Sequence, residues 1–150
     1  LERLRLWEMA PHFGAGVDAM RKATYEASSL PARVREVARM RIAQINQCPI
    51  CLDTRAASAM QQGLTEEMYS HVHEYADSGD YSERERLAIE FAERFATEHQ
   101  NLDGTFFAAL REQFSDVEIL ELATTIAFCL GIGRVYTVLD IANECPVAMK

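Results

Sequence analysis

The sequence predicts an all-α protein that forms one domain. Its 150 residues, 49% of them apolar, suit one domain with a core of its own. Helix start signals recur along the whole length, and no alternating apolar and polar run lies between Asn-Gly or Asp-Gly turns. Neither a repeat nor a Pro/Gly-rich linker divides the chain. We therefore expect a single domain over residues 1–150.

Three helices are predicted in the first third of the chain. Two of them cover about residues 2–9 and 15–28, and the third follows Leu30-Pro31 and ends near Gln47. In the third helix an apolar stripe repeats at helical intervals, formed by Val34, Val37, Ala38, Ile42 and Ile45. Four arginines lie mostly off this stripe: Arg33, Arg35, Arg39 and Arg41.

Cys48-Pro49 predicts the next helix start, because proline fits the first helical position, where its missing N–H costs nothing. This helix should run to Gly63, a typical C-terminal stop. Cys48 would then be the N-cap residue, and Cys51 would lie in the first turn.

Three further helix starts follow. Thr65 with two glutamates begins a helix that should close at Ser78-Gly79-Asp80. The segments 82–85 and 115–118 both match the capping box, in which a serine hydroxyl and a glutamate carboxylate bond free backbone N–H groups reciprocally. The two long helices that follow direct apolar residues inward: Leu87, Phe91 and Phe95 from the first, and Ile119, Leu122, Ile126, Cys129 and Leu130 from the second.

The charge balance and the hydropathy pattern exclude several classes of protein. Fifteen basic against 23 acidic residues give a net charge of −8, which repels phosphate backbones and anionic membrane surfaces. The most apolar segment, 119–141, contains Glu121, Arg134 and Asp140, which is typical of a core helix rather than a membrane span. The first residues lack the pattern of a secretory signal. We expect a cytoplasmic protein with neither nucleic acid nor membrane as a partner.

Cys48 and Cys51 form a C-x-x-C pair, Cys48-Pro49-Ile50-Cys51. Four cysteines are too few for a disulfide scaffold, and in a reducing compartment a close pair is more often catalytic or metal-binding. A helix N-terminus favours the reactive thiolate, and the spacing brings both sulfurs within bonding range on one turn. The product of oxidation is then a local disulfide that a second reductant can reopen.

Two other interpretations of the pair stay open. Zinc would need further ligands from His71 and His73, or from Cys129 and Cys145, but the spacing H-x-H is unusual for zinc and a second C-x-x-C is missing. The pair could also be two inert buried thiols. We expect no metal and no cofactor, an inert Cys129, and a free thiol at Cys145.

The segment from Arg35 to Cys51 resembles the signature stretch of the alkylhydroperoxidase D (AhpD) and carboxymuconolactone decarboxylase superfamily. The resemblance continues through segments 63–67, 82–88 and 114–122, and so covers roughly residues 30 to 140. It implies an AhpD-like helical bundle.

The resemblance also implies a set of site residues. Cys51 matches the peroxide-reactive cysteine of the family, Cys48 its resolving partner, and Glu36 the carboxylate of its proton relay. The family's histidine, four residues after the second cysteine, is replaced here by Arg55. Arginine stays protonated, so it can donate hydrogen bonds or supply positive charge but cannot act as a base. Arg55 could hold a thiolate in its charged form, or it could form a salt bridge, for instance with Glu36.

The function that the resemblance implies is that of a thiol-dependent peroxidase or disulfide oxidoreductase of the peroxiredoxin type, with an antioxidant role. Its partners would be a peroxide or disulfide substrate, an unidentified thiol reductant, and further copies of itself in a trimer or hexamer. Two alternatives remain: a lyase similar to carboxymuconolactone decarboxylase, which works without a dithiol, and a non-catalytic oligomeric binding module whose site has decayed.

Overall fold

The protein is an all-α structure, as predicted. The computed structural model describes residues 6–141 and the backbone of 148–149. The first long helix, α2 (Pro11–Lys22), continues into a π-helical turn, η1 (Ala23–Ala27). The helix predicted at 15–28 is therefore present, but it begins at Pro11, where a proline in the first turn costs no hydrogen bond. Of the helix predicted at 2–9, residues 2–5 lie outside the described residues, and residues 7–9 form a turn and a bend instead of a helix.

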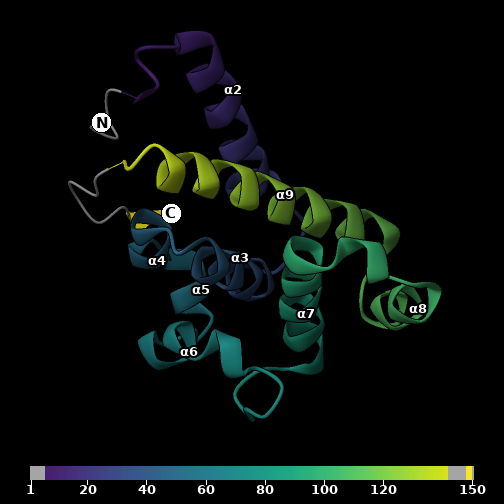
Figure 1. Cartoon of the computed structure of the whole chain (residues 1–150). Coiled ribbons are helices and arrows are strands. Elements are labelled where there is room, and N and C mark those ends of the chain that lie inside the picture. The colour runs from purple at the N-terminus through teal and green to yellow at the C-terminus, as the bar shows by residue number, and fades with distance from the viewer. Residues whose placement is uncertain (1–5, 142–147, 150) are drawn as a thin grey trace.

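The centre of the fold is α3 (Ala32–Asn46), which packs against α7 (Glu83–Thr97) and α9 (Asp116–Val138) (Figure 1). Because neighbours surround α3, its arginines do not all reach solvent as the apolar stripe suggested. Arg35 and Arg39 are only 3% and 4% exposed. A helix at the centre of a bundle is buried on several faces, and its charged residues must then find partners inside the protein.

The single helix predicted from Pro49 to Gly63 is wrong. The structure has two short helices, α4 (Pro49–Asp53) and α5 (Ala57–Gln61), separated by a two-residue strand, β1 (Arg55–Ala56). β1 pairs in parallel with β2 (Ala148–Met149). At the break the Thr54 hydroxyl donates to the carbonyl of Ile50, and buried Arg39 donates to the carbonyls at the end of α4. These bonds take the place of the backbone hydrogen bonds that a continuous helix would form here.

The helix predicted from Thr65 to residue 78 is shorter than expected. Thr65 does cap α6 (Glu66–Ser70), but a 3₁₀ turn, η2 (Val72–Glu74), follows at once. Tyr69 and Val72 are both buried in the cluster that packs against α3, and the tighter turn lets both side chains face inward.

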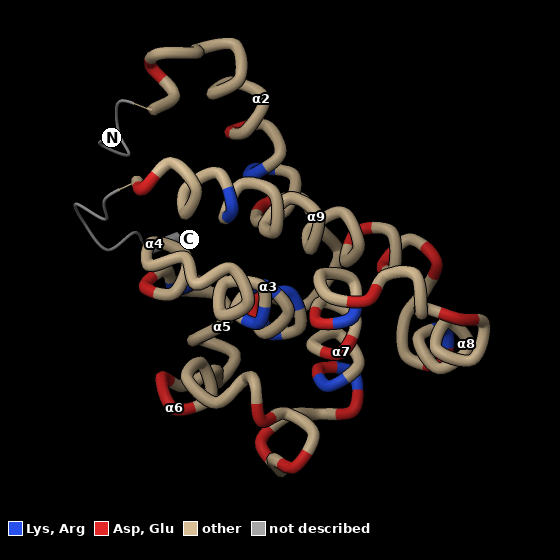
Figure 2. The backbone as a smooth tube through the Cα atoms, viewed as in Figure 1, with Lys and Arg blue, Asp and Glu red and all other residues tan. Residues whose placement is uncertain are grey.

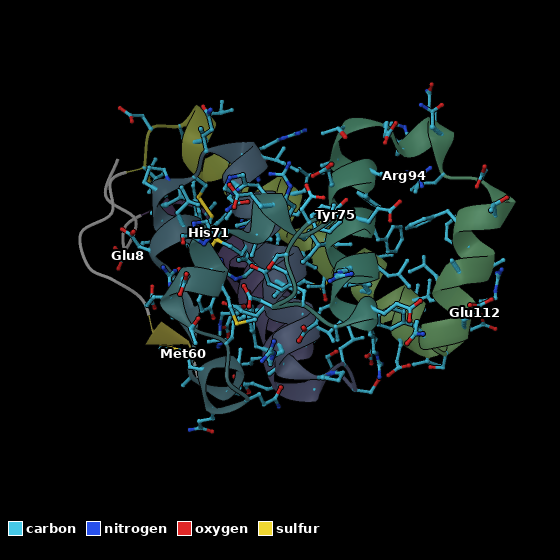
Figure 3. The ribbon with its side chains drawn as sticks, turned by 90° about the horizontal axis from the view of Figure 1, so that it is seen from below. Glu8, Met60, His71, Tyr75, Arg94 and Glu112 are labelled. Carbon is cyan, nitrogen blue, oxygen red and sulfur yellow. A yellow bond between two sulfur atoms is a disulfide. The ribbon has the colours of Figure 1, made fainter. Side chains whose placement is uncertain are left out.

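A further helix was not predicted. Asp103 caps α8 (Gly104–Gln113), which follows the 3₁₀ turn η3 (His99–Asn101). In Figure 3, α8 carries Glu112 at the edge opposite Met60 and His71.

Both predicted capping boxes are confirmed. Ser82 begins α7 and Ser115 begins α9, and in each case the serine and the glutamate three residues later bond each other's backbone N–H. The inward faces predicted for these helices are confirmed as well, since both contribute to one core with α3 and α8. A second core lies between α3, α5 and α6.

Helix α9 is the most apolar element of the described chain. By length and composition alone it could cross a membrane, and 22% of its most apolar window is buried. One such helix is weak evidence, because core helices of soluble proteins pass the same test. Figure 2 shows that charges are confined to the two ends of α9. Three large apolar side chains of α9 are exposed, Val117, Leu120 and Val138, and so is Leu139 directly after the helix.

Candidate active site

The two cysteines of the C-x-x-C motif lie where α3 ends and α4 begins. Gln47 takes the left-handed conformation, with φ of 51°, and this turns the chain out of α3. Cys48 is the N-cap of α4, as predicted, and its Sγ accepts a hydrogen bond of 3.3 Å from the backbone N–H of Cys51. The two cysteines form a disulfide, with their Cα atoms 5.2 Å apart.

The two cysteines differ in what can reach them. Cys48 has no exposed surface, whereas Cys51 is partly exposed and lines a cavity of about 110 Å³. The walls of this cavity come from α2 with η1, α3, α4 and α9, and most of its lining is aliphatic or aromatic. A small organic molecule or a peroxide in this cavity would therefore meet Cys51 and not Cys48.

Glu36 is fully buried, and its carboxylate is held by two neighbours. Arg39 donates to it through two nitrogens, Nε at 2.8 Å and Nη2 at 2.6 Å, and the hydroxyl of Tyr69 donates at 3.0 Å. Arg39 also donates to the carbonyl of Cys51 at 2.6 Å. The structure thus connects Glu36 to the Cys51 segment through Arg39.

Arg39 was not among the predicted site residues. The sequence did carry a signal for it, since Glu36 and Arg39 are three residues apart on one helix, a spacing at which side chains meet. Because the pair is buried, removing either partner would leave an uncompensated charge inside the protein, which costs more than breaking a surface pair.

Arg55 points away from the disulfide, toward α6. Its guanidinium pairs with the exposed carboxylate of Glu66 at 2.9 Å and donates to the carbonyls of Leu52 and Thr54. It also lies over the ring of Tyr69, 4.3 Å from the ring centre. Of the two interpretations of Arg55, the structure supports the salt bridge. Its partner is Glu66, however, and not Glu36. The Arg55 guanidinium lowers the pKa of the Glu66 carboxyl.

Hydrogen bonds of the Asn46 side chain hold α9 against the segment that carries the two cysteines. The Asn46 side chain donates to the carbonyl of Leu130 at 3.1 Å and accepts from Arg134 at 3.0 Å. α9 can approach this closely because residue 133 is glycine. A Cβ atom on Gly133 would lie 2.7 Å from Asn46 Nδ2 and 3.5 Å from Cys51 Sγ.

The wall of the cavity opposite α4 carries Tyr25 and Cys129. Burial raises the pKa of the Cys129 thiol to about 11, and the positive charge of Arg39 offsets only part of this rise. This agrees with the prediction that Cys129 is unreactive at neutral pH, while Cys145 lies outside the described residues.

The zinc ligands considered from the sequence are not brought together. His71 and His73 are exposed, Cys48 is bonded to Cys51, and Cys145 lies outside the described residues. Within residues 6–141, no three side chains of His, Cys, Asp or Glu gather into a group that could hold a metal ion.

A helical bundle with a C-x-x-C pair at the junction of two helices defines the class to which this protein belongs, that of the AhpD-like proteins. The sequence matches the profile of the carboxymuconolactone decarboxylase family over residues 11–94. The chain belongs to that family.

Two curated relatives are similar in sequence over most of the chain. The chain is 25% identical over 126 residues to the uncharacterized protein YdfG of Bacillus subtilis, covering 83% of this chain and 85% of YdfG. It is 26% identical to the uncharacterized protein YnjA of Escherichia coli, covering 82% of this chain and 69% of YnjA.

The solved structures share the fold. One of them is a protein of unknown function from Agrobacterium tumefaciens that is described as an antioxidant defence protein AhpD. It superposes with a TM-score of 0.81 at 21% identity, over 97% of this chain and 99% of that one. The debrominase Bmp8 superposes with a TM-score of 0.76 at 21% identity, over 93% of this chain and 75% of that one.

Proposed function

We propose that this protein is a thiol-dependent peroxidase or disulfide oxidoreductase that works through Cys48 and Cys51. The observation that carries the proposal is the disulfide itself, with one sulfur sealed and the other at the wall of a cavity. The fold that the chain shares with a protein described as an antioxidant defence AhpD supports the same activity.

The proposed cycle starts from the reduced pair. The thiolate of Cys51 attacks the outer oxygen of a hydroperoxide ROOH, the O–O bond breaks, and Cys51 becomes a sulfenic acid. The Cys48 thiol then attacks the Cys51 sulfur and forms the disulfide. Over both steps the dithiol and ROOH give the disulfide, ROH and water. A thiol reductant of unidentified origin closes the cycle by exchange.

The other site residues have supporting roles in this proposal. Glu36 carries the proton-relay function of the family and orients Arg39, which in turn fixes the backbone of Cys51. Arg55 stabilises the turn after α4 through Leu52 and Glu66 and acts on the site only through Tyr69.

The cellular setting completes the proposal. We place the protein in the cytoplasm, where thiol reductants keep such a pair cycling. We also propose that it works as a homo-oligomer, and the exposed apolar side chains of α2 and α9, such as Phe13 and Leu120, support this. Size-exclusion chromatography with light scattering tests the oligomer: a single species at the mass of one chain would contradict it.

The direct test is oxidation of the reduced protein by stoichiometric hydroperoxide, followed by alkylation and mass spectrometry. We expect a loss of two hydrogens located on the peptide that carries Cys48 and Cys51. Cys51→Ser should abolish the reaction, whereas Cys48→Ser should stop at the sulfenic acid of Cys51. The matched control is Cys129→Ser, which should leave the product unchanged.

A dithiol that survives this treatment unoxidised would contradict the proposed activity. Decarboxylation of a lactone acid that persists in a double variant, Cys48→Ser with Cys51→Ser, would favour the lyase instead.

A second candidate reaction uses the same dithiol on a different substrate. The structural neighbour Bmp8 is a debrominase, and one of its structures holds 2,3,4-tribromopyrrole. The specific observation that favours such a reaction here is the mainly apolar cavity beside Cys51, roughly the size of one small ring. The dithiol and an aryl bromide would give the disulfide, the arene and hydrogen bromide. Bromide released by the reduced wild type but not by Cys51→Ser would support it.

A further inference from the structure

The proposed peroxidase step needs a proton donor inside the cavity. When Cys51 attacks a hydroperoxide, the departing oxygen leaves as an alkoxide or hydroxide, and general acid catalysis of such a step is worth about 10²- to 10⁴-fold. Arg55, which occupies the position of the family's histidine, does not line the cavity and is bound to Glu66. Glu36, the carboxylate of the family's proton relay, does not line the cavity either, so the donor is sought among the residues that do.

We propose that Tyr25 is the catalytic proton donor to the departing oxygen of the substrate. The inference rests on the proposed peroxidase function and adds to it a residue that lies in a different part of the chain from the C-x-x-C motif.

The position of Tyr25 follows from the local backbone. Val17, Arg21 and Tyr25 are spaced by four residues and all line the cavity, so one stripe of α2 and η1 forms its outer wall. Tyr25 lies in the π-helical turn, where one extra residue per turn is accommodated; such turns are rare and often occur at functional sites. Tyr25 lines the same cavity as Cys51 and Cys129, so a substrate held against Cys51 also meets the side chain of Tyr25.

Two arginines lie close to Tyr25, the group that would release the proton in this step. The guanidinium of Arg35 lies over the Tyr25 ring, 5.1 Å from its centre. Arg35 is 3% exposed, and its Nε–H has no hydrogen-bond partner among the described residues. Burial raises the pKa of Tyr25 most, and the guanidiniums of Arg39 and Arg35 offset part of that rise, which limits the cost of a phenolate in the cavity.

The other polar groups of the cavity fit the role less well. Arg39 already uses Nε, Nη1 and Nη2 in bonds to Glu36 and to backbone carbonyls. The Thr54 hydroxyl donates to the carbonyl of Ile50. Tyr136 packs edge-on against Trp7 and has no arginine over its ring among the described residues.

The proton balance closes without a further reactant. The Cys51 thiolate and ROOH give the sulfenic acid and RO⁻, which takes the proton of Tyr25 and leaves as ROH. The phenolate then regains the proton that Cys51 released when it ionised. Burial holds the pKa of Tyr25 well above its usual value, so that the phenol is protonated when the substrate arrives. An alkoxide is a stronger base still, so the transfer remains downhill.

The test compares two oxidants of similar size that differ in the departing group. Tert-butyl hydroperoxide releases an alkoxide, which needs a proton, whereas peracetic acid releases a carboxylate, whose conjugate acid has a pKa of about 4 and needs none. The rate of Cys51 oxidation is measured in the reduced full-length protein by quenching with an alkylating agent and mass spectrometry. We compare the wild type, Tyr25→Phe, and the matched control Tyr75→Phe, which changes a tyrosine outside the cavity.

We expect Tyr25→Phe to react about 10²- to 10⁴-fold more slowly with tert-butyl hydroperoxide and within about twofold of the wild type with peracetic acid. Tyr75→Phe should match the wild type with both. An equal loss with both oxidants would mean that Tyr25 only shapes the cavity. Selective loss in Tyr136→Phe, but not in Tyr25→Phe, would transfer the role to Tyr136. A wild type that reacts with neither oxidant would refute the peroxidase function itself, and this assignment with it.

Discussion

The close approach of α9 to the cysteine segment can be tested at one atom. Replacing Gly133 by alanine would bring a Cβ to 2.7 Å from Asn46 Nδ2, and the end of Asn46 cannot simply swing away because it is bonded to Leu130 and Arg134. The exposed Gly131, two residues earlier on the same helix, is the control, since a Cβ there meets no atom of the described part of the chain within 4 Å.

The magnitude follows from two opposing terms. Glycine to alanine inside a helix stabilises by about 1 kcal/mol, and this term alone acts in Gly131→Ala. In Gly133→Ala the same gain is offset by about 1–3 kcal/mol for overpacking and for the loss of the Asn46 bond. We therefore expect Gly133→Ala to be less stable than Gly131→Ala by about 1–3 kcal/mol, in keeping with these two terms.

Urea unfolding followed by circular dichroism measures the difference. The displaced Asn46 also borders the disulfide, so Gly133→Ala should change the rate at which a small thiol reduces Cys48–Cys51, whereas Gly131→Ala should not. Equal stability of the two variants, within about 0.5 kcal/mol, would refute the packing argument, because ordinary surface changes fall within that range.

Three more predictions concern the residues around the cysteines. Arg39→Met leaves Glu36 buried without its partner and should lower the free energy of unfolding by about 3–5 kcal/mol in urea titrations, while adding Glu36→Leu should recover part of that loss. Gln47→Gly should raise the free energy of unfolding by about 0.5–1 kcal/mol, because the left-handed conformation at this position strains any side chain; an unchanged or lower midpoint would argue against that strain. Alkylation of Cys129 needs the thiolate, and burial raises its pKa to about 11, so its labelling rate should keep rising with pH well beyond 9; a plateau below pH 9 would contradict this.

Local signals predicted those parts of the fold that local interactions determine. Ser82 and Ser115 begin their helices as predicted, because a capping box needs only four consecutive residues. Cys48 caps α4 for the same reason. The break at Thr54 could not be found in this way, since it depends on Arg39 and on pairing with residues 148–149, nearly a hundred positions away.

The residues of the candidate site also fall into those that the sequence predicted and those that only the structure shows. The C-x-x-C spacing predicted Cys48 and Cys51, and the family resemblance added Glu36. The structure connects Glu36 to Cys51 through Arg39, but it gives Arg55 a partner that the sequence did not indicate. Tyr25 carries no sequence signal at all. Its place at the cavity depends on how α2 and η1 cross α9, which is a property of the tertiary structure.

The unequal burial of the two sulfurs gives thiol exchange a fixed direction. Displacement at a disulfide requires the incoming thiolate to approach one sulfur in line with the bond, and only Cys51 offers such an approach. The covalent adduct must then form on Cys51, and the departing electron pair must settle on Cys48, where a backbone N–H already points at the sulfur. Reduction and oxidation of this protein accordingly pass through the same atom.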